Sequence, residues 1–378
     1  LATGETTTVK SADHDLGGVI LCGESGEYMI YTENADGFDR LHIDREGEPA
    51  GLDTSLLPEG QYQTSCPLTG AKLSIHVNGW RTPGDVYVMD LETGELDQVF
   101  ASDYAGLDPD RLIRPESVRM TARDGVELQG LLYLPDESSR EADGPPPVIF
   151  FVHGGPTGQS VANFDAVVQY HLDRGLAVFE PNVRGSTGFG RTYVTLDDQK
   201  KRRDSVRDLI DMLAALEADG RVDTSRAAVV GGSYGGYMVN AVLALYPDAF
   251  DAGAALFGVG NWVTALQVAS PSLKASDRIE YGDISEQEWV DYYTENSPVA
   301  LADNIKVPVL YSHGVQDPRI DISETEIMVK TLRENGIETP YIRIPDEGHG
   351  WRKLKNQLYY FRRQANFLEE QLTGETAE

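Results

Sequence analysis

The chain has 378 residues, 40% hydrophobic and 25% charged, which is long enough to bury a large core and to form two domains. Acidic residues outnumber basic ones by 61 to 32, and the resulting net charge of −29 argues against nucleic acid and anionic membranes as partners. The longest apolar run, residues 147–152, has the length of a strand and falls far short of a membrane span.

Residues 1–115 contain short apolar runs separated by turn residues, a pattern that predicts an all-β domain. Two of its segments, 26–31 and 70–75, are similar in sequence and lie 44 positions apart, and Cys22 and Cys66 are separated by the same 44 positions. A repeat of about 44 residues, with several strands per unit, has the size of a β-propeller blade. We therefore predict a partial β-propeller of about two blades, with an ordinary β-meander as the alternative.

Two blades cannot close a ring, because propellers typically contain four to eight. The chain also begins without methionine, so we expect a longer N-terminal propeller part of the same protein to accompany it. Equivalent positions on neighbouring blades are expected to be a blade's width apart, whereas the Cα atoms of a disulfide lie within about 7 Å of each other. The sequence therefore predicts two free thiols, at Cys22 and Cys66.

Residues 116–378 alternate strand-like apolar runs with helical stretches, which predicts an α/β domain with a doubly wound, mostly parallel sheet. An early buried strand, 148–152, ends in His153-Gly154-Gly155-Pro156. Glycines at such a point let the backbone approach a ligand closely, and a plain turn is the alternative.

The apolar run 227–230 leads into Gly231-Gly232-Ser233-Tyr234-Gly235-Gly236, and residues 237–246 have helical apolar spacing. A strand, G-x-S-x-G and a helix in this order are the context of a nucleophile elbow. The strained turn exposes the serine hydroxyl at the helix N-terminus, where the helix dipole favours a developing oxyanion. We therefore predict an α/β-hydrolase fold with Ser233 as nucleophile, against the alternative of a glycine-rich connecting turn.

A serine nucleophile needs a base and an acid that orients the base, and α/β-hydrolases carry them in the order Ser, Asp or Glu, His. Strand 307–312 leads to Asp317 and strand 341–344 leads to His349, so both lie at the carboxyl edge of the predicted sheet. We predict Asp317 as the acid and His349 as the base. The alternatives are His313 for the base, and Asp321, Asp346 and Glu347 for the acid.

The same fold forms an oxyanion hole from two backbone N–H groups, one in the loop after the third strand and one in the residue after the nucleophile. This predicts Gly155 and Tyr234 as the donors. The sequence contains neither CxxC nor HExxH, so it predicts no metal site, and the triad chemistry calls for no cofactor.

Five motifs follow one another along the second region: His153-Gly154-Gly155-Pro156, Asn182-Val183-Arg184-Gly185-Ser186-Thr187-Gly188-Phe189-Gly190, Gly232-Ser233-Tyr234-Gly235-Gly236, Asp317-Pro318-Arg319-Ile320 and Gly348-His349. With the partial propeller before them, they resemble the prolyl oligopeptidase family of serine peptidases, nearest its acylaminoacyl-peptidase branch. The sequence departs mildly from the family pattern, with Gly232 where Trp is frequent and Ile320 where Val is usual.

The resemblance implies cleavage of short peptides, with the propeller limiting access to the site. It also implies that Arg319 binds the acyl or carbonyl group of the substrate, and a structural salt bridge is the alternative role for this residue.

We therefore predict a serine hydrolase that cleaves short or N-acylated peptides through an acyl-enzyme on Ser233. A carboxylesterase with the same triad is the first alternative, and a non-catalytic propeller–hydrolase scaffold is the second. A homo-oligomer is compatible with the sequence. The cytoplasm is slightly favoured as the compartment, although no sequence signal fixes it.

Overall fold

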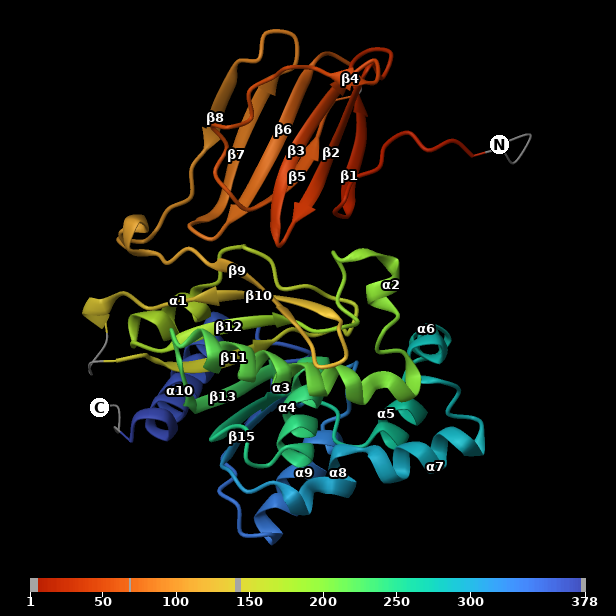
Figure 1. Ribbon diagram of the computed structural model, residues 1–378, viewed down its shortest axis with the longest axis vertical. Helices are drawn as coiled ribbons and strands as arrows, with labels where there is room; N and C mark the ends of the chain where they lie inside the picture. The colour runs from red at the N-terminus through yellow and green to blue at the C-terminus, as the bar shows by residue number, and fades with distance from the viewer. Residues whose placement is uncertain (1–5, 68, 140–143, 375–378) are drawn as a thin grey trace. The chain divides into compact units, whose positions relative to one another are not determined.

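The computed structural model describes residues 6–67, 69–139 and 144–374 (Figure 1). These residues form two compact units. The first contains the chain up to Pro115 together with Val161–Asp165 and Gly188–Gly190, and the second contains the rest. Within the described ranges, no helix combines the length and the apolar character that a membrane span requires.

The first unit is built from two four-stranded antiparallel sheets, in each of which consecutive strands are neighbours. The strands are β1 (Leu16–Cys22), β2 (Tyr28–Ala35), β3 (Phe38–Arg45), β4 (Glu48–Pro49), β5 (Gln61–Ser65), β6 (Lys72–Gly79), β7 (Thr82–Asp90) and β8 (Leu96–Phe100). Alternate side chains of β6, namely Leu73, Ile75 and Val77, are fully buried, as expected for a strand with one face on a core. The β2–β3 hairpin turns at Asp36 and Gly37, which both have positive φ, and glycine accepts this conformation without strain.

The sequence repeat has a structural counterpart in these two sheets. β2 begins at Tyr28 and β6 begins at Lys72, and each is the second strand of its sheet. Four antiparallel strands are the usual content of a propeller blade, but other all-β folds also pair two such sheets. The partial-propeller interpretation therefore stays a prediction.

The prediction of two free thiols is wrong, because Cys22 and Cys66 form a disulfide whose Cα atoms are 5.9 Å apart. Cys22 ends β1 and Cys66 directly follows β5, and these first strands of the two sheets contact each other. The prediction assumed that equivalent positions on two neighbouring sheets are a full blade's width apart, but these two positions lie on strands that are in contact. The disulfide joins one sheet to the other.

The second unit is built on one eight-stranded sheet with the order β16-β15-β14-β13-β11-β12-β10-β9. Its strands are β9 (Glu116–Thr121), β10 (Glu127–Tyr133), β11 (Pro147–Val152), β12 (Ala177–Asn182), β13 (Asp223–Gly232), β14 (Ala252–Leu256), β15 (Val309–Gly314) and β16 (Tyr341–Ile344). The six strands from β12 to β16 along this order are parallel, while β9 and β10 pair antiparallel at the opposite edge. The predicted α/β class and mostly parallel sheet are confirmed.

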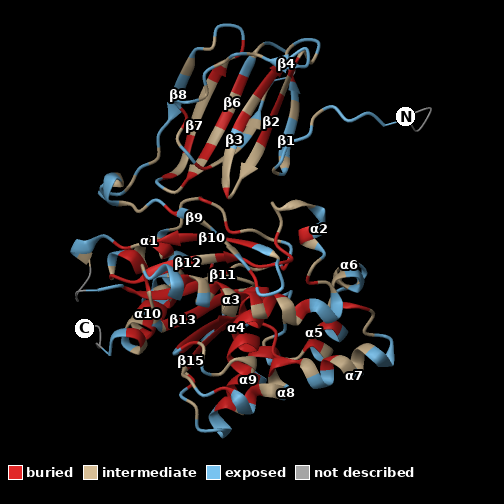
Figure 2. Cartoon of the chain, viewed as in Figure 1, coloured by how far each residue is buried: buried red, intermediate tan, exposed pale blue. Residues whose placement is uncertain are grey.

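Helices cover both faces of this sheet, and the central strands are therefore buried (Figure 2). The helices of the chain are α1 (Ala166–Asp173), α2 (Gly190–Val194), α3 (Arg202–Asp219), α4 (Tyr234–Leu245), α5 (Trp262–Val268), α6 (Pro271–Tyr281), α7 (Gln287–Asn296), α8 (Pro298–Leu301), α9 (Ser323–Glu334) and α10 (Leu354–Thr373), with short 3-10 turns at Pro109–Arg111, Glu137–Ser139, Gln199–Lys201 and Ala302–Asn304.

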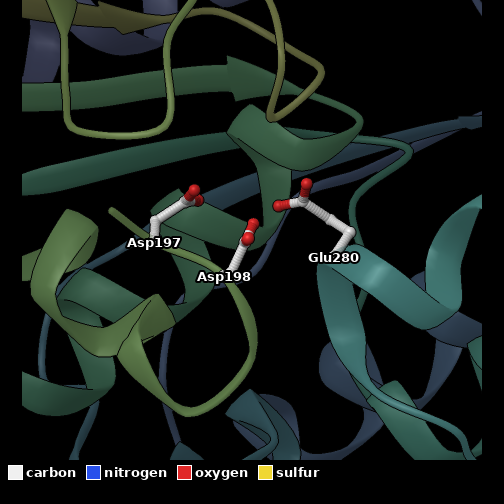
Figure 3. Close-up of side chains that lie close together, drawn as sticks. All are labelled: Asp197, Asp198 and Glu280. Carbon is white, nitrogen blue, oxygen red and sulfur yellow. The ribbon is translucent and has the colours of Figure 1, made fainter. Parts of the chain in front are cut away.

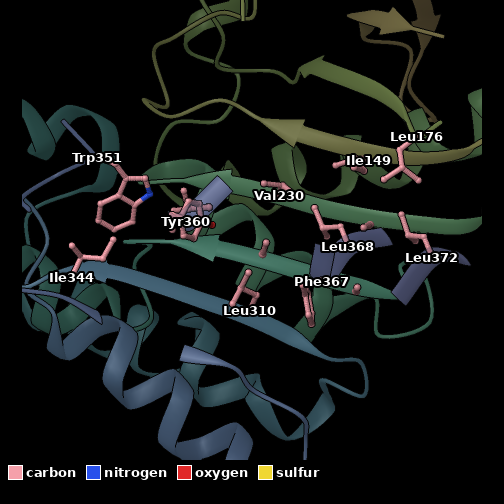
Figure 4. Packing of buried hydrophobic residues seen from close by; sticks show 14 residues of the cluster. Ile149, Leu176, Val230, Leu310, Ile344, Trp351, Tyr360, Phe367, Leu368 and Leu372 are labelled. Carbon is pink, nitrogen blue, oxygen red and sulfur yellow. The ribbon is translucent and has the colours of Figure 1, made fainter. Parts of the chain in front are cut away.

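Successive residues of a central strand pack against different helices, as the alternation of a strand requires. A Cβ at Gly253 of β14 would meet the side chains of Val239 and Leu243 on α4. Its neighbours Ala252 and Ala254 belong instead to the core cluster that contains Tyr360 and Leu368 of α10. Figure 4 shows the labelled members of this cluster around the sheet. The sheet is thereby clamped from both sides, which holds its carboxyl edge in place.

Candidate active site

Ser233 lies in the sharp turn between β13 and α4, as the motif predicts. Its backbone has φ +59° and ψ −120°, a sparsely populated conformation for a residue with a side chain. The Ser233 N–H donates to the carbonyl of Leu256 at 2.9 Å, and its own carbonyl accepts from the N–H of Tyr237 at 3.0 Å. The neighbouring strand and the helix thus hold the strained turn from both sides.

The glycines around Ser233 are required by backbone packing. A Cβ at Gly235 would lie 2.2 Å from the carbonyl oxygen of Val152 at the end of β11. A Cβ at Gly231 would lie 2.5 Å from the backbone of Gly235. No side chain fits at either position, so the helix can start immediately after the strand only because both residues are glycine.

Asp317 and His349 are joined by a hydrogen bond of 2.7 Å from the His349 Nδ1–H to Asp317 Oδ2. The other carboxylate oxygen of Asp317 accepts from the backbone N–H of Arg319 at 2.8 Å and of Ile320 at 3.1 Å. Burial alone would raise the pKa of Asp317, but hydrogen bonds from His313, His349 and these two backbone groups outweigh burial and hold the pKa well below its usual range. Asp317 is therefore an ionised acceptor for the imidazole.

The two residues follow neighbouring parallel strands, β15 and β16, and β14 separates β15 from the elbow strand β13. All three loops therefore leave the sheet at its carboxyl edge.

Phe257 connects His349 with the elbow. Its ring lies 4.6 Å from the His349 ring, measured between centroids, and a Cβ at Gly232 would lie 3.1 Å from its edge. Phe257 follows β14, and its N–H donates to the carbonyl of Ser312 at 2.7 Å. The imidazole of His349 thus packs against Phe257, whose ring edge lies beside Gly232, the residue before the serine. Sequence reasoning missed Phe257, because no motif marks it.

The rival base, His313, is fully buried inside β15. Its Nδ1 lies 2.8 Å from the Thr325 hydroxyl, and its Nε2 lies 3.1 Å from the carbonyl oxygen of Ile320. The same Nε2 lies 3.4 Å from Asp317 Oδ2. Both ring nitrogens are thus committed to partners within the fold, and His313 supports the carboxylate of Asp317.

The rival acids also have other partners. Asp321 accepts from the backbone N–H of Ser323 at the start of α9. Asp346 pairs with the ammonium of Lys353 at 2.7 Å, and Glu347 accepts from the backbone N–H of Lys353 at 2.9 Å, just before α10. These three carboxylates thus bind groups at or near the starts of α9 and α10, a role that the loop sequence alone could not distinguish from catalysis.

The two predicted oxyanion-hole donors lie on either side of the elbow. Tyr234 is the first residue of α4, so its N–H has no partner within the helix. Gly155 has φ +143°, and a Cβ there would lie 2.7 Å from the N–H nitrogen of Thr157. A Cβ at the preceding Gly154 would lie 3.5 Å from the Cβ of Ser233, so this loop passes directly beside the serine.

His153 braces the glycine loop. Its Nδ1 lies 2.8 Å from the carbonyl oxygen of Gly154, and its Nε2 lies 2.9 Å from the hydroxyl of Ser186. Burial lowers the pKa of His153, so the ring is neutral. The loop after β12, which contains Ser186, thus supports the loop after β11.

Arg319, predicted to bind substrate, has an exposed side chain. Its backbone orients Asp317, while no ion pair joins its guanidinium to any residue of the described ranges. The guanidinium belongs to the residue two positions after Asp317 and is exposed to solvent. The salt-bridge alternative has no partner there.

A cluster of acidic groups lies near the start of α3. Asp197, Asp198 and Glu280 bring carboxylate oxygens within 4.8 Å of one another. Figure 3 shows these three side chains lying close together. Arg202 contacts two of them, with Nη1 2.7 Å from Asp197 Oδ2 and Nη2 on the Glu280 carboxylate. Burial raises the pKa of Asp197 to about 6, and the charge of Arg202 opposes this rise. Arg202 therefore compensates part of the negative charge of the cluster.

The chain is similar to known proteins in sequence and in fold. A model of the prolyl oligopeptidase family matches residues 162–375. Dipeptidyl aminopeptidase BIII of Pseudoxanthomonas mexicana is 32% identical over 76% of the chain, and the acylamino-acid-releasing enzyme of Arabidopsis thaliana is 29% identical over 62% of it. The alignments cover 43% and 31% of these relatives. The crystal structure of a puromycin hydrolase superimposes on the whole chain and on 58% of its own length, with a TM-score of 0.88 and 23% identity.

Proposed function

Since this chain belongs to the prolyl oligopeptidase family, we propose that it is the catalytic part of a serine peptidase with Ser233 as nucleophile. The observation that carries the proposal is the Asp317–His349 hydrogen bond, at the edge of the sheet where the strained Ser233 turn also lies. The chain spans less than half the length of the curated relatives named above, so the activity of the whole protein is part of the proposal.

In the first half of the proposed reaction, the Ser233 hydroxyl oxygen attacks the carbonyl carbon of the scissile bond. His349 Nε2 accepts the hydroxyl proton, because its Nδ1 donates to Asp317. The same proton then passes from His349 to the leaving amine, the C–N bond breaks, and an ester links the acyl group to Ser233.

In the second half, water attacks this acyl-enzyme and gives one proton to His349. The imidazolium returns the proton to the Ser233 oxygen, which releases the free acid and restores the enzyme. Asp317 keeps its charge throughout, because its hydrogen bonds hold its pKa low, and it stabilises each transient imidazolium.

Both tetrahedral intermediates carry a negative oxygen, for which we propose the N–H groups of Gly155 and Tyr234 as donors. The support for this pair is that each belongs to a backbone segment at the serine and that neither can shift without disturbing close glycine contacts. Donors held in place in this way stabilise the charge without reorganisation cost.

We propose short or N-acylated peptides as substrates. The similarity to an acylamino-acid-releasing enzyme supports the N-acylated class, and the exposed Arg319 guanidinium is a suitable donor to an acyl or carbonyl oxygen. The similarity to a dipeptidyl aminopeptidase is higher in identity and favours a second candidate, the release of dipeptides from a free amino terminus. The two candidates share the triad and differ in what binds the substrate terminus.

We also propose that residues 1–115 are part of a β-propeller and that residues 116–378 form the catalytic domain. Apolar side chains that are more than half exposed lie on the first and last strands of the two sheets, Val19 and Leu21 on β1 and Val99 and Phe100 on β8. Further blades of the same protein are the partner that fits such faces, because they would cover both the apolar side chains and the open sheet edges.

The proposal is tested with Ser233→Ala and a matched control, Ser225→Ala, which changes an exposed serine near the other end of β13. We expect Ser233→Ala to lower kcat on the order of 10⁶-fold and Ser225→Ala to leave it unchanged. The assays compare an acetyl-alanine anilide, a dipeptidyl anilide with a free amino terminus and a simple aryl ester.

Preference for one of the two anilides identifies the peptidase class. Hydrolysis of the ester alone would favour the carboxylesterase alternative. If wild-type Ser233 also failed to react with a fluorophosphonate probe, the non-catalytic scaffold would replace the proposed enzyme.

A further inference from the structure

The side chain of Tyr234 is buried, with 3% of the residue exposed, while its backbone N–H is one of the two donors proposed above for the oxyanion. Arg202 Nη1 donates to the phenol oxygen at 3.0 Å. Ser205 Oγ lies 3.0 Å from the same oxygen, and the phenol donates to Asp197 Oδ2 at 3.3 Å. Tyr234 therefore has one end at the proposed reaction centre and the other end in a buried polar network.

Arg202 is the centre of this network and is only 2% exposed. Besides Tyr234 and Asp197, it binds Glu280, through the carboxylate and through the backbone carbonyl at 3.0 Å. Its guanidinium carbon lies 4.4 Å from the ring centroid of Tyr281. The carboxylates in Figure 3 come from the loop before α3 and from the end of α6, so groups from several elements fix the guanidinium.

Stability alone gives little reason for this arrangement. Removing a guanidinium and two carboxylates from water costs free energy, and well-packed apolar side chains of similar volume are often equally stabilising. What a planar guanidinium adds is geometry, because its rigid donors bind several acceptors at fixed angles. Here one of those acceptors belongs to the first residue of α4.

We propose that Arg202 is a positioning residue for the oxyanion hole, acting through the phenol of Tyr234. The inference rests on the proposed function. An oxyanion donor is effective only when its nitrogen lies about 2.7–3.1 Å from the charged oxygen. Anchoring the phenol fixes the first turn of α4 and with it the Tyr234 N–H, so the anchor acts in the transition state and hardly in substrate binding.

The test compares Tyr234→Phe, Arg202→Met and the double variant. Tyr234→Phe removes only the phenol oxygen and leaves the backbone N–H and every ion pair of Arg202. We expect each single variant to lower kcat about tenfold, with KM changed by less than about twofold, because removing an oxyanion donor outright costs about 10²–10³. The double variant should be no slower than Arg202→Met, since both changes break the same link.

Arg174→Met is the matched control. Arg174 also donates to a tyrosine hydroxyl, that of Tyr170 at 3.0 Å, and pairs with a glutamate, Glu369, but it connects α1 with α10. We expect this variant to keep the wild-type kcat. A peptidyl boronate, whose tetrahedral adduct uses the same donors, should bind more weakly to Tyr234→Phe and Arg202→Met in proportion to their loss of kcat/KM.

An unchanged kcat in Tyr234→Phe, or costs that add in the double variant, would overturn the inference. If Arg202→Met fails to fold, Tyr234→Phe and its boronate affinity decide the question. A wild-type chain that is inert toward both the anilides and the fluorophosphonate overturns the proposed function, and this inference with it, whereas an active wild type with an unaffected Tyr234→Phe overturns this inference alone.

Discussion

At the scale of single residues, Asp317 is the group whose environment is most specialised. We predict that Asp317→Asn lowers kcat about 10⁴-fold, because an amide neither stabilises the imidazolium nor selects the working tautomer of His349. Steady-state kinetics on a peptide anilide measures the effect. Asp321→Asn, in the same loop, is the control and should retain activity, since the hydrogen bonds of Asp321 go to Ser323 at the start of α9 and none goes to His349.

The same substitution has a predicted pH signature in stability. The pKa of Asp317 is depressed in the folded state, so ionised Asp317 contributes stability above its unfolded pKa of about 4, and this contribution is lost as the pH falls toward the folded pKa. The difference in unfolding free energy between wild type and Asp317→Asn should therefore stay nearly constant from pH 7 to about pH 5 and shrink as the pH falls below about 4. If the difference in unfolding free energy did not change with pH, Asp317 would not be the ionised, stabilising carboxylate described here.

Ser233, Asp317 and His349 could be predicted from the sequence because each follows an apolar run, and the order of the runs fixes which sheet edge they share. Phe257 and Arg202 could not be predicted. Phe257 acts by packing between two loops, and Arg202 acts through a buried contact between residues 32 positions apart. Neither relation leaves a periodic or local pattern in the chain.

At the scale of elements, the elbow depends on how closely β11, β13 and α4 approach one another. We predict that Gly235→Ala destabilises the second unit by about 1–3 kcal/mol or more, although alanine favours helices, because its Cβ would lie 2.2 Å from a backbone oxygen. Urea denaturation gives the loss. Gly232→Ala is the control, since the atom it meets, at 3.1 Å, belongs to the Phe257 ring, which is freer to shift.

A Gly235→Ala variant as stable as wild type would show that β11 and α4 can separate without cost.

The strands at this site were predictable because buried parallel strands are short continuous apolar runs. The sequence pattern does not predict which strands of two different sheets come into contact, and Cys22 and Cys66 are the example. Repeat analysis predicts equivalent positions for them, but only packing shows that the ends of β1 and β5 bring their Cα atoms to 5.9 Å from each other.

At the scale of the whole molecule, the disulfide stabilises one unit and leaves the other untouched. We predict that the double variant Cys22→Ser and Cys66→Ser destabilises the first unit by up to about 4 kcal/mol, the chain-entropy value for a closed loop of 44 residues. Calorimetry in the presence and absence of reductant measures this loss. Ser233 should still react with a fluorophosphonate, because every residue of the proposed site belongs to the second unit.

A variant whose serine no longer reacts would show that the site depends on the disulfide-bonded sheets. No change in melting behaviour would mean that the bond constrains the unfolded chain less than a flexible loop of this length should.

The Cys22–Cys66 bond also makes the segment between them a covalent ring, which contains all of β2 to β5 and the exposed loop around residues 51–56. A protease that cuts once inside this ring opens it without releasing a fragment. The nicked chain should therefore migrate as one species on a denaturing gel without reductant and as two with reductant. Cleavage damage in this segment would pass unnoticed in any purification that never reduces the sample.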